Sequence, residues 1–393
     1  MGEQLTYVMI PPYSIIKSRT GGILGRLLAS DNVSLAGARM FIFSNEFVAE
    51  YIETFASSPE PWRALWKTYI REHLGHPNVL GLSGRCMVLL FRGENARAHI
   101  KDDVIGSITD KWPRGDTIRG TYGDYIVDRS GEVRYFEPAV ITGRNDETLA
   151  AQLRLLAKYA RPDGGILEQK VAFPGATNVQ TTLVILKPDN FYRPSRRPGN
   201  IVDVFSKTGL NIVAASLFSF TAKMGEEFYG QLRPIFVEKL RGGVADALKE
   251  HLKGAFGFAI TDETYDQMAG LLAADNAETE FNRIVEYMSG IQGGTHCPPA
   301  QRDRPGPNKC LALLYRGQDA IEAIRKWLGS TNPDQADAGT VRSDFGRDLM
   351  RNAAHASDSA ENAERERRII GLWTENPDEP SAFERTIHEY LDG

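Results

Sequence analysis

The chain has 393 residues, more than one hydrophobic core usually organises, and 42% of them are apolar, which is enough to fill two domains. Its 46 basic and 51 acidic residues are spread along the whole chain and leave a formal net charge of -5, which argues against DNA, RNA or an anionic membrane as a partner. Three cysteines cannot build a disulfide framework, no charged and apolar leader opens the chain, and no apolar run approaches the roughly 18 residues of a membrane span, so we expect a cytoplasmic protein.

Strand and helix patterns follow one another in the same order in both halves of the chain. Each half shows a β-branched strand, a turn and a helix, a second strand, helical segments, a third strand, another helix and a short last strand. The expected strands are 5–10, 38–44 and 86–91, then 182–187, 212–220 and 310–315, and the expected first helices are 22–29 and 199–207. This β-α-β-β-α-β order predicts an α+β fold of two tandem ferredoxin-like domains with antiparallel sheets.

Two pairs of segments indicate that the chain is internally duplicated. The segment VLLFRGENA at 88–96 matches ALLYRGQDA at 312–320, and DTIRGTYGD at 116–124 matches GTVRSDFGR at 339–347. Both matches occur in the same order along the chain, after two strands of similar pattern. Matches in register are the signature of a repeated structural unit.

The boundary between the two copies lies near 159–180, where Pro and Gly interrupt the periodic pattern. We therefore predict one domain at 1–165 and a second at 178–393. The second copy is longer than the first, and its extra residues are expected as insertions near 241–280 and 291–309.

The two predicted insertions differ in character. Residues 241–280 hold two helix-like runs, the second opened by a cap at Thr261 or Asp262. Residues 291–309 are rich in Gly and Pro and predict an irregular loop. The candidate ligands in and beside this loop lack the paired spacing of a zinc site, so we predict no metal-ligand set; they are His296, Cys297 and Cys310.

Polar side chains gather between residues 329 and 366. They are Thr331, Arg342, Asn352, His355, Ser357 and Glu366. A neutral imidazole, with an ordinary pKa of about 6.5, is a capable nucleophile at cellular pH, and guanidinium and ammonium groups offset the charge of a transferring phosphoryl group. The chain has no G-x-x-x-x-G-K-[ST] loop, so nucleotide phosphates must be held by other groups. The cluster suits phosphoryl transfer through a covalent histidine intermediate.

The segments LVILKPDN, FYGQLRPIF, GSTNPDQADAGTVRSDFG and RNAAHASDSAENAERE resemble the signature segments of nucleoside diphosphate kinases. The resemblance implies that His355 takes the γ-phosphate of one nucleoside triphosphate and passes it to a second nucleoside diphosphate. It places Glu366 on the other imidazole nitrogen, with Ser357 supporting Glu366. It also implies that Lys187 reaches the γ-phosphate and that Tyr229 stands beside the histidine.

The same resemblance implies how the nucleotide is held. Arg325, Thr331 and Arg342 would bind the phosphates, and Asn352 would contact the ribose. The implied cofactor is Mg²⁺, held mainly by the nucleotide phosphates and water. The base site departs from the family pattern, because Ile235 stands where the family stacks the base on a phenylalanine; the neighbouring base-site candidates are Phe236 and Leu349. A weaker or differently built base site is therefore expected.

The first copy has lost the residues that the resemblance assigns to chemistry. Pro11 stands in the place of Lys187, Glu137 and Pro138 stand near the place expected for the histidine, and no histidine lies between residues 99 and 251. We therefore predict a degenerate, catalytically silent first domain. Its Arg119 is interpreted as a structural residue rather than a phosphate ligand.

Three functions remain open on the sequence. The first is a nucleoside diphosphate kinase that acts by a ping-pong route on substrates such as ATP and GDP and self-associates into a homo-oligomer. The second is a nucleotide-binding regulatory or assembly module with little turnover, which the altered base site favours. The third is transfer from the histidine to a protein partner.

Overall fold

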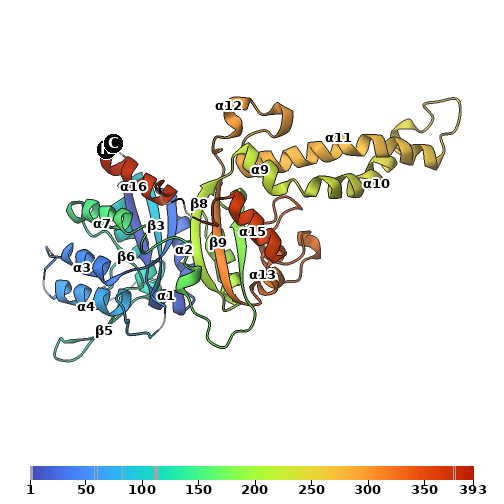
Figure 1. Cartoon of the computed structure of the whole chain (residues 1–393). Coiled ribbons are helices and arrows are strands. Elements are labelled where there is room, and N and C mark those ends of the chain that lie inside the picture. The colour runs from blue at the N-terminus through green and yellow to red at the C-terminus, as the bar shows by residue number, and fades with distance from the viewer. Residues whose placement is uncertain are drawn as a thin grey trace. The chain divides into compact units, whose positions relative to one another are not determined.

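The computed structural model describes residues 3–56, 58–59, 61–81, 83–109, 114–374, 376 and 378–393. It divides the chain into two compact units, the first made of residues 1–218 and 311–393 and the second of residues 219–310. The first unit holds two four-stranded sheets, and the second holds mainly helices (Figure 1).

The sheet of the N-terminal half is antiparallel and has the strand order β2-β3-β1-β6. Its strands are β1 (Glu3–Ile10), β2 (Ser34–Ile42), β3 (Arg85–Glu94) and β6 (Ile141–Thr142), and the hairpin β4 (Asp124–Val127) and β5 (Val133–Glu137) stands apart from it. The helices are α1 (Pro12–Ile16), α2 (Thr20–Leu28), α3 (Asn45–Glu53), α4 (Trp62–Leu74), α5 (Ala96–Ala98), a π-helix (His99–Ile105), α6 (Ile118–Tyr122) and α7 (Asp146–Lys158). Alternate residues of β1 bury their side chains against α3, α4 and α7, because successive residues of a strand point to opposite faces.

The sheet of the C-terminal half repeats this order as β10-β7-β9-β8. Its strands are β7 (Val179–Leu186), β8 (Asn211–Ser219), β9 (Lys309–Gln318) and β10 (Ala354–Ala356). The helices of this half within the first unit are α8 (Arg197–Ser206), α13 (Ala320–Leu328), α14 (Val341–Phe345) and α15 (Ala360–Ile369). The strands of both sheets thus follow one another along the chain as predicted, and the strand that comes first in the sequence lies in the interior of each sheet.

The two halves also share unusual backbone conformations at matching places. Non-glycine residues rarely adopt a positive φ, so paired occurrences are informative. The matching positive-φ residues are Asn95 and Asp319 (52° and 49°), Gly106 and Gly329 (77° and 86°), and Ala139 and Ala353 (62° and 71°). The internal repeat seen in the sequence is therefore a repeat of backbone geometry as well.

Contacts join the two halves within the first unit. Helices α2 and α8 approach so closely that a Cβ atom added to Gly199 would lie 2.2 Å from the backbone nitrogen of Gly25. The Arg85 guanidinium donates to the carbonyl of Ile212 at 2.8 Å. The C-terminal helix α16 (Ala382–Asp392) adds Phe383 to the core of the N-terminal half. The domain boundary predicted between residues 165 and 178 remains a prediction, and both sheets lie in one compact unit.

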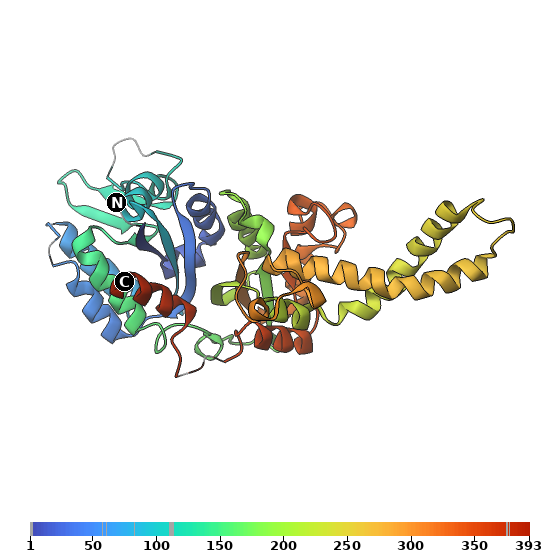
Figure 2. The ribbon, with the colours of Figure 1, turned by 90° about the horizontal axis from the view of Figure 1, so that it is seen from above.

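The second unit contains the segments predicted as insertions. It consists of α9 (Ala222–Tyr229), α10 (Leu232–Leu252), α11 (Asp262–Ser289), a short 3₁₀ turn and α12 (Pro299–Arg302). Helices α10 and α11 run side by side in both views (Figures 1 and 2). Thr261, one of the two cap candidates in the sequence, caps α11 by accepting a hydrogen bond from the Thr264 N–H. The Arg233 guanidinium pairs with Glu278 at 2.8 Å and ties the two helices together.

Candidate active site

The imidazole of His355 lies on β10, the edge strand that pairs with β7. Its Nε2 atom is 2.8 Å from Oε2 of Glu366, a buried carboxylate on α15. A carboxylate only accepts hydrogen bonds, so Nε2 carries the hydrogen and the lone pair of a neutral ring is on Nδ1. The Ser357 hydroxyl donates to the same Glu366 oxygen at 2.6 Å. The three side chains thus form one hydrogen-bonded unit that fixes the tautomer of the imidazole.

A second group of side chains surrounds the end of β7. The Lys187 ammonium, which is buried, donates to Oδ1 of Asn352 at 2.7 Å. The amide nitrogen of Asn352 in turn donates to the backbone carbonyls of Thr331 and Leu349 at 3.0 and 3.1 Å. The backbone N–H of Lys187 donates to the carbonyl of Ala353, two residues before the histidine. Hydrogen bonds therefore join Lys187 and Asn352 to the backbone at Thr331 and Leu349, next to β10.

The guanidinium of Arg342 on α14 joins the same region. It donates to the carbonyl of Gly329 at 3.1 Å and to the Thr331 hydroxyl at 3.4 Å, and its other terminal nitrogen lies 3.4 Å from the carbonyl of Ala354. Thr340 caps this short helix by accepting a hydrogen bond from the Ser343 N–H. The cap and the carbonyl contacts position a positive charge close to the strand that carries His355.

The contacts above leave untested the roles predicted for the remaining side chains, which are those of Arg325, Leu349, Tyr229, Ile235 and Phe236. Arg325 is exposed on α13 and lines a shallow hollow with Asp358 and Ser359. Leu349 contributes its carbonyl, but its side chain is 64% exposed. The other three belong to the second unit, where Tyr229 is buried, Ile235 is exposed and Phe236 is half-buried. The roles assigned to all of these residues remain predictions.

Two residues with supporting roles were not predicted. Asn190, which follows Lys187-Pro188-Asp189 in the chain, is buried and donates to the carbonyls of Lys187 and Ala353 at 2.9 and 2.7 Å. Arg197 pairs with Asp189 at 2.7 Å and donates to the carbonyl of Phe345 at 2.6 Å. The place of Asn190 close to Lys187 in the chain is a sequence signal for its role. Arg197 has no such signal, because Phe345 becomes its neighbour only on folding.

In the N-terminal half, Arg119 repeats the contacts of Arg342. It donates to the carbonyls of Gly106 and Val140 at 3.2 and 3.4 Å, the counterparts of Gly329 and Ala354. Burial lowers the pKa of Arg119 to about 10. These contacts hold the guanidinium of Arg119 in place, and its side chain also lines a cavity beside the position equivalent to the histidine. The interpretation that Arg119 binds no phosphate stays a prediction.

That position is occupied by Ile141 rather than by Glu137 or Pro138, which the sequence had suggested. Ile141 pairs with Met9 of β1 as His355 pairs with Ile185 of β7. Glu137 instead accepts hydrogen bonds from the Tyr69 hydroxyl at 2.9 Å and from the Ala139 N–H at 3.0 Å. Its burial raises the pKa of the carboxyl to about 7. The register of the short last strand, which sequence alone does not set, accounts for the difference.

Comparisons with known proteins agree with the sequence resemblance. Residues 301–373 match the family model for nucleoside diphosphate kinase. The nucleoside diphosphate kinase of Methanosphaera stadtmanae is 29% identical over 210 residues, which cover 53% of this chain and 97% of that protein. The enzyme of the same name from Brevibacillus brevis is 27% identical over 213 residues, covering 54% of this chain and 100% of that protein. A solved NDP kinase from Pyrobaculum aerophilum aligns at 26% identity over 49% of this chain and 94% of its own, with a TM-score of 0.34.

In the part of the chain that the structure describes, no helix is both long enough and apolar enough to cross a membrane. The described residues also contain no group of three or more His, Cys, Asp and Glu side chains placed to hold a metal ion.

Proposed function

Because this chain is related to the nucleoside diphosphate kinases, we propose that it transfers the γ-phosphate of a nucleoside triphosphate to a nucleoside diphosphate through phospho-His355. The observation that carries the proposal is the bond between Nε2 of His355 and the buried carboxylate of Glu366. That bond leaves the lone pair of the neutral ring on Nδ1, the state needed for attack on phosphorus.

The proposed reaction has two steps. In the first, Nδ1 of His355 forms a bond to the γ-phosphorus while the bond from that phosphorus to the bridging oxygen breaks, and the nucleoside diphosphate leaves. In the second, a terminal oxygen of another nucleoside diphosphate attacks the same phosphorus, and the phosphorus–nitrogen bond breaks. The ring gains positive charge when it is phosphorylated, and the Glu366 carboxylate beside Nε2–H stabilises that charge.

The cations of the site suit a highly charged substrate. Lys187 and Arg342 are both largely buried close to β10, where water screens their charge poorly. Their ammonium and guanidinium groups are hydrogen-bond donors, which fit phosphate oxygens rather than a metal ion. These residues therefore fit a nucleotide that carries its own Mg²⁺. When bound, the ion offsets part of the charge on the phosphate oxygens.

The degenerate N-terminal half has a structural role in this proposal. The α2–α8 contact joins it to the C-terminal half, and glycines at Gly21, Gly25 and Gly199 allow the two backbones to meet. This contact within one chain takes the place of a contact between two subunits. We further expect the full chain to self-associate, since closed symmetric assemblies are common among soluble proteins.

The test is a phosphoenzyme assay on the full chain. Incubation with γ-labelled ATP and Mg²⁺ should give an acid-labile, base-stable label that discharges onto added GDP. His355→Gln should abolish both the label and the transfer, whereas the control His388→Gln, on the exposed face of α16, should change neither. Normal transfer by His355→Gln would overturn the mechanism.

One observation keeps the second function open. Ile235, which stands in the sequence where the family stacks the base on a phenylalanine, is an aliphatic side chain with 44% exposure. A binding or regulatory module would bind ATP without acquiring the label. The kinase should instead accept both purine and pyrimidine diphosphates, because apolar contacts with a base discriminate weakly.

A further inference from the structure

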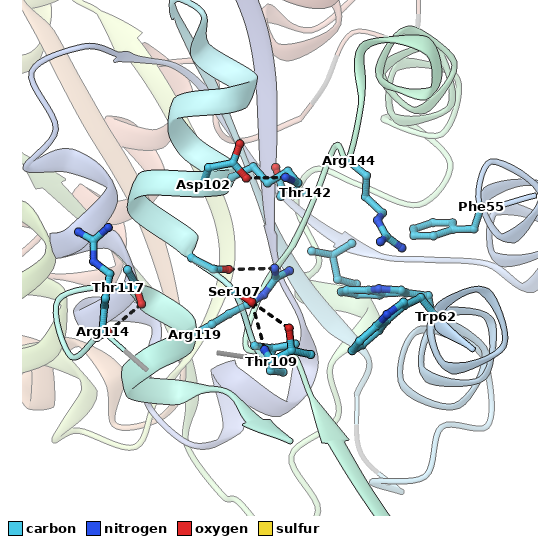
Figure 3. A pocket seen from close by; sticks show the side chains of 15 residues that line it. Phe55, Trp62, Asp102, Ser107, Thr109, Arg114, Thr117, Arg119, Thr142 and Arg144 are labelled. Carbon is cyan, nitrogen blue, oxygen red and sulfur yellow. Dashed lines mark hydrogen bonds and ion pairs between the residues drawn. The ribbon is translucent and has the colours of Figure 1, made fainter. Parts of the chain in front are cut away.

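The N-terminal half contains a cavity of about 380 Å³ that the proposed phosphotransfer does not use. It is bordered by α4, by the residues that follow the π-helix, by α6 and by the segment from β6 to α7 (Figure 3). Ligand pockets in proteins commonly measure about 300–1,000 Å³, so this cavity has room for one ring and one phosphoryl group. A pair of hydrogen-bonding side chains, Ser107 and Thr109, shapes one wall, with 3.1 Å between their hydroxyl oxygens.

The cavity occupies the place in the N-terminal half that corresponds to the candidate active site. Arg119 and Ile141 both line it, and they are the counterparts of Arg342 and His355 by hydrogen bonding and by strand register. Ile141 has no atom that can accept a phosphoryl group. The duplicated backbone has therefore kept a cavity but lost the nucleophile.

Two guanidinium groups give this cavity its charge. Arg119 donates only to backbone carbonyls, and Arg144 donates to the Ser58 hydroxyl at 3.4 Å. Within the described residues, no carboxylate lies within ion-pair distance of either group. Asp102 also lines the cavity, but it forms its ion pair with Lys101. Burial is the largest cause that lowers the pKa of Arg119, and the like charge of Arg144 lowers this pKa further. The carboxylate of Asp102 raises it.

Arg119 and Arg144 carry like charges and face the cavity with no carboxylate of the described residues in ion-pair distance. This arrangement favours an anion as ligand. Arginine presents several N–H donors in a flat fork that matches the oxygens of a phosphate group, and pairing with an anion removes the cost of leaving the charges unpaired. Arg114 adds a third cation at the rim, where Asp116 pairs with it at 2.9 Å.

Aromatic rings form the opposite wall. The guanidinium groups of Arg119 and Arg144 lie 5.7 and 5.9 Å from the ring centre of Trp66, which is buried. The half-buried Trp62 lines the same cavity, and Figure 3 shows it on the side away from Arg114. Indole faces stack well on flat rings, including nucleic-acid bases of any kind.

From this arrangement we infer that the cavity of the N-terminal half binds a small phosphate ester that carries a flat aromatic ring, the chemistry of a nucleoside monophosphate, and does not transfer its phosphate. The inference does not depend on the reaction proposed for His355. It assigns the degenerate half a ligand of its own in addition to its contact with the other half.

The experiment is a calorimetric titration of the full chain with AMP and, separately, with ribose 5-phosphate, which has the phosphate but no ring. Arg144→Met should remove one class of AMP site or weaken it at least tenfold. Arg144→Lys, which keeps the charge, should retain part of that affinity and so separates loss of charge from loss of folding. Arg154→Met, an exposed arginine of α7, is the matched control and should bind as the wild type does.

The site that Arg144→Met removes should bind AMP at least tenfold more tightly than ribose 5-phosphate, and Trp62→Phe should narrow that ratio. Equal affinity for the two ligands would show that the aromatic wall contributes nothing and would overturn the inference. AMP binding that is the same in the wild type, Arg144→Met and Arg144→Lys would also overturn it.

Discussion

Removal of the Glu366 carboxylate is the sharpest test of the site geometry. Glu366→Ala deletes the acceptor that holds Nε2 of His355 at 2.8 Å and leaves the Ser357 hydroxyl without its partner at 2.6 Å. A hydrogen bond to a charged group contributes about 1.5–3 kcal/mol. Since about 1.4 kcal/mol corresponds to a tenfold change in rate, phosphorylation of His355 should slow by about 10- to 150-fold.

The assay is single-turnover labelling with γ-labelled ATP in a quench-flow instrument. Glu366→Gln keeps an oxygen acceptor without the charge, so its loss should be smaller, about tenfold. Ser357→Ala leaves the carboxylate and its bond to His355, so its effect should be smaller still.

A second readout separates positioning from general damage to the fold. Nitrogen-15 NMR of labelled histidine should show the Nε2–H tautomer in the wild type and a mixture of tautomers in Glu366→Ala. If Glu366→Ala labels at the wild-type rate and keeps the Nε2–H tautomer, Glu366 does not position the nucleophile and the reasoning is refuted.

Three further changes test other parts of the structure. Lys187→Ala should lower turnover at least tenfold in a steady-state assay, because it deletes a charge directed at the transferring group. The control Lys239→Ala, at an exposed position of α10, should leave turnover unchanged. Equal rates for the two variants would remove Lys187 from the mechanism. The pKa of Glu137 rises from 4.5 to about 7 on folding, so the folded state binds the extra proton between these values and stability should fall by about 3 kcal/mol as the pH rises through this window. Glu137→Gln should lack this slope in urea denaturation at pH 5 and pH 8, and a slope shared by both proteins would contradict the assignment. Gly199→Ala should lower the free energy of unfolding by about 1–3 kcal/mol, because the new Cβ meets the backbone of α2. Gly242→Ala on α10, where the new Cβ meets nothing within 4 Å, should raise the free energy of unfolding slightly. Similar effects of the two changes would argue against a tight contact between the halves.

Features that depend on short stretches of chain could be predicted from the amino-acid sequence. Strand and helix order follows from hydrophobic periodicity, and the cap at Thr261 follows from the preference of a threonine oxygen for the free N–H groups at a helix start. The internal repeat was also readable, because a duplicated backbone keeps similar residues at turns and caps. The similarity of residues 301–373 to the family model for nucleoside diphosphate kinase rests on the same kind of local signal.

Contacts between residues far apart in the chain could not be predicted in this way and were seen only in the folded structure. The register of β6 put Ile141 in the position of the histidine, since a strand of two residues carries too little pattern to fix its own pairing. Folding brought α16 from the C-terminus onto the N-terminal core, where Phe383 packs against Phe41 with 5.7 Å between ring centres. It also brought Arg119 and Arg144 to one cavity. Such contacts join residues far apart in the chain, and they are set by the burial of apolar surface across the whole fold rather than by any local pattern.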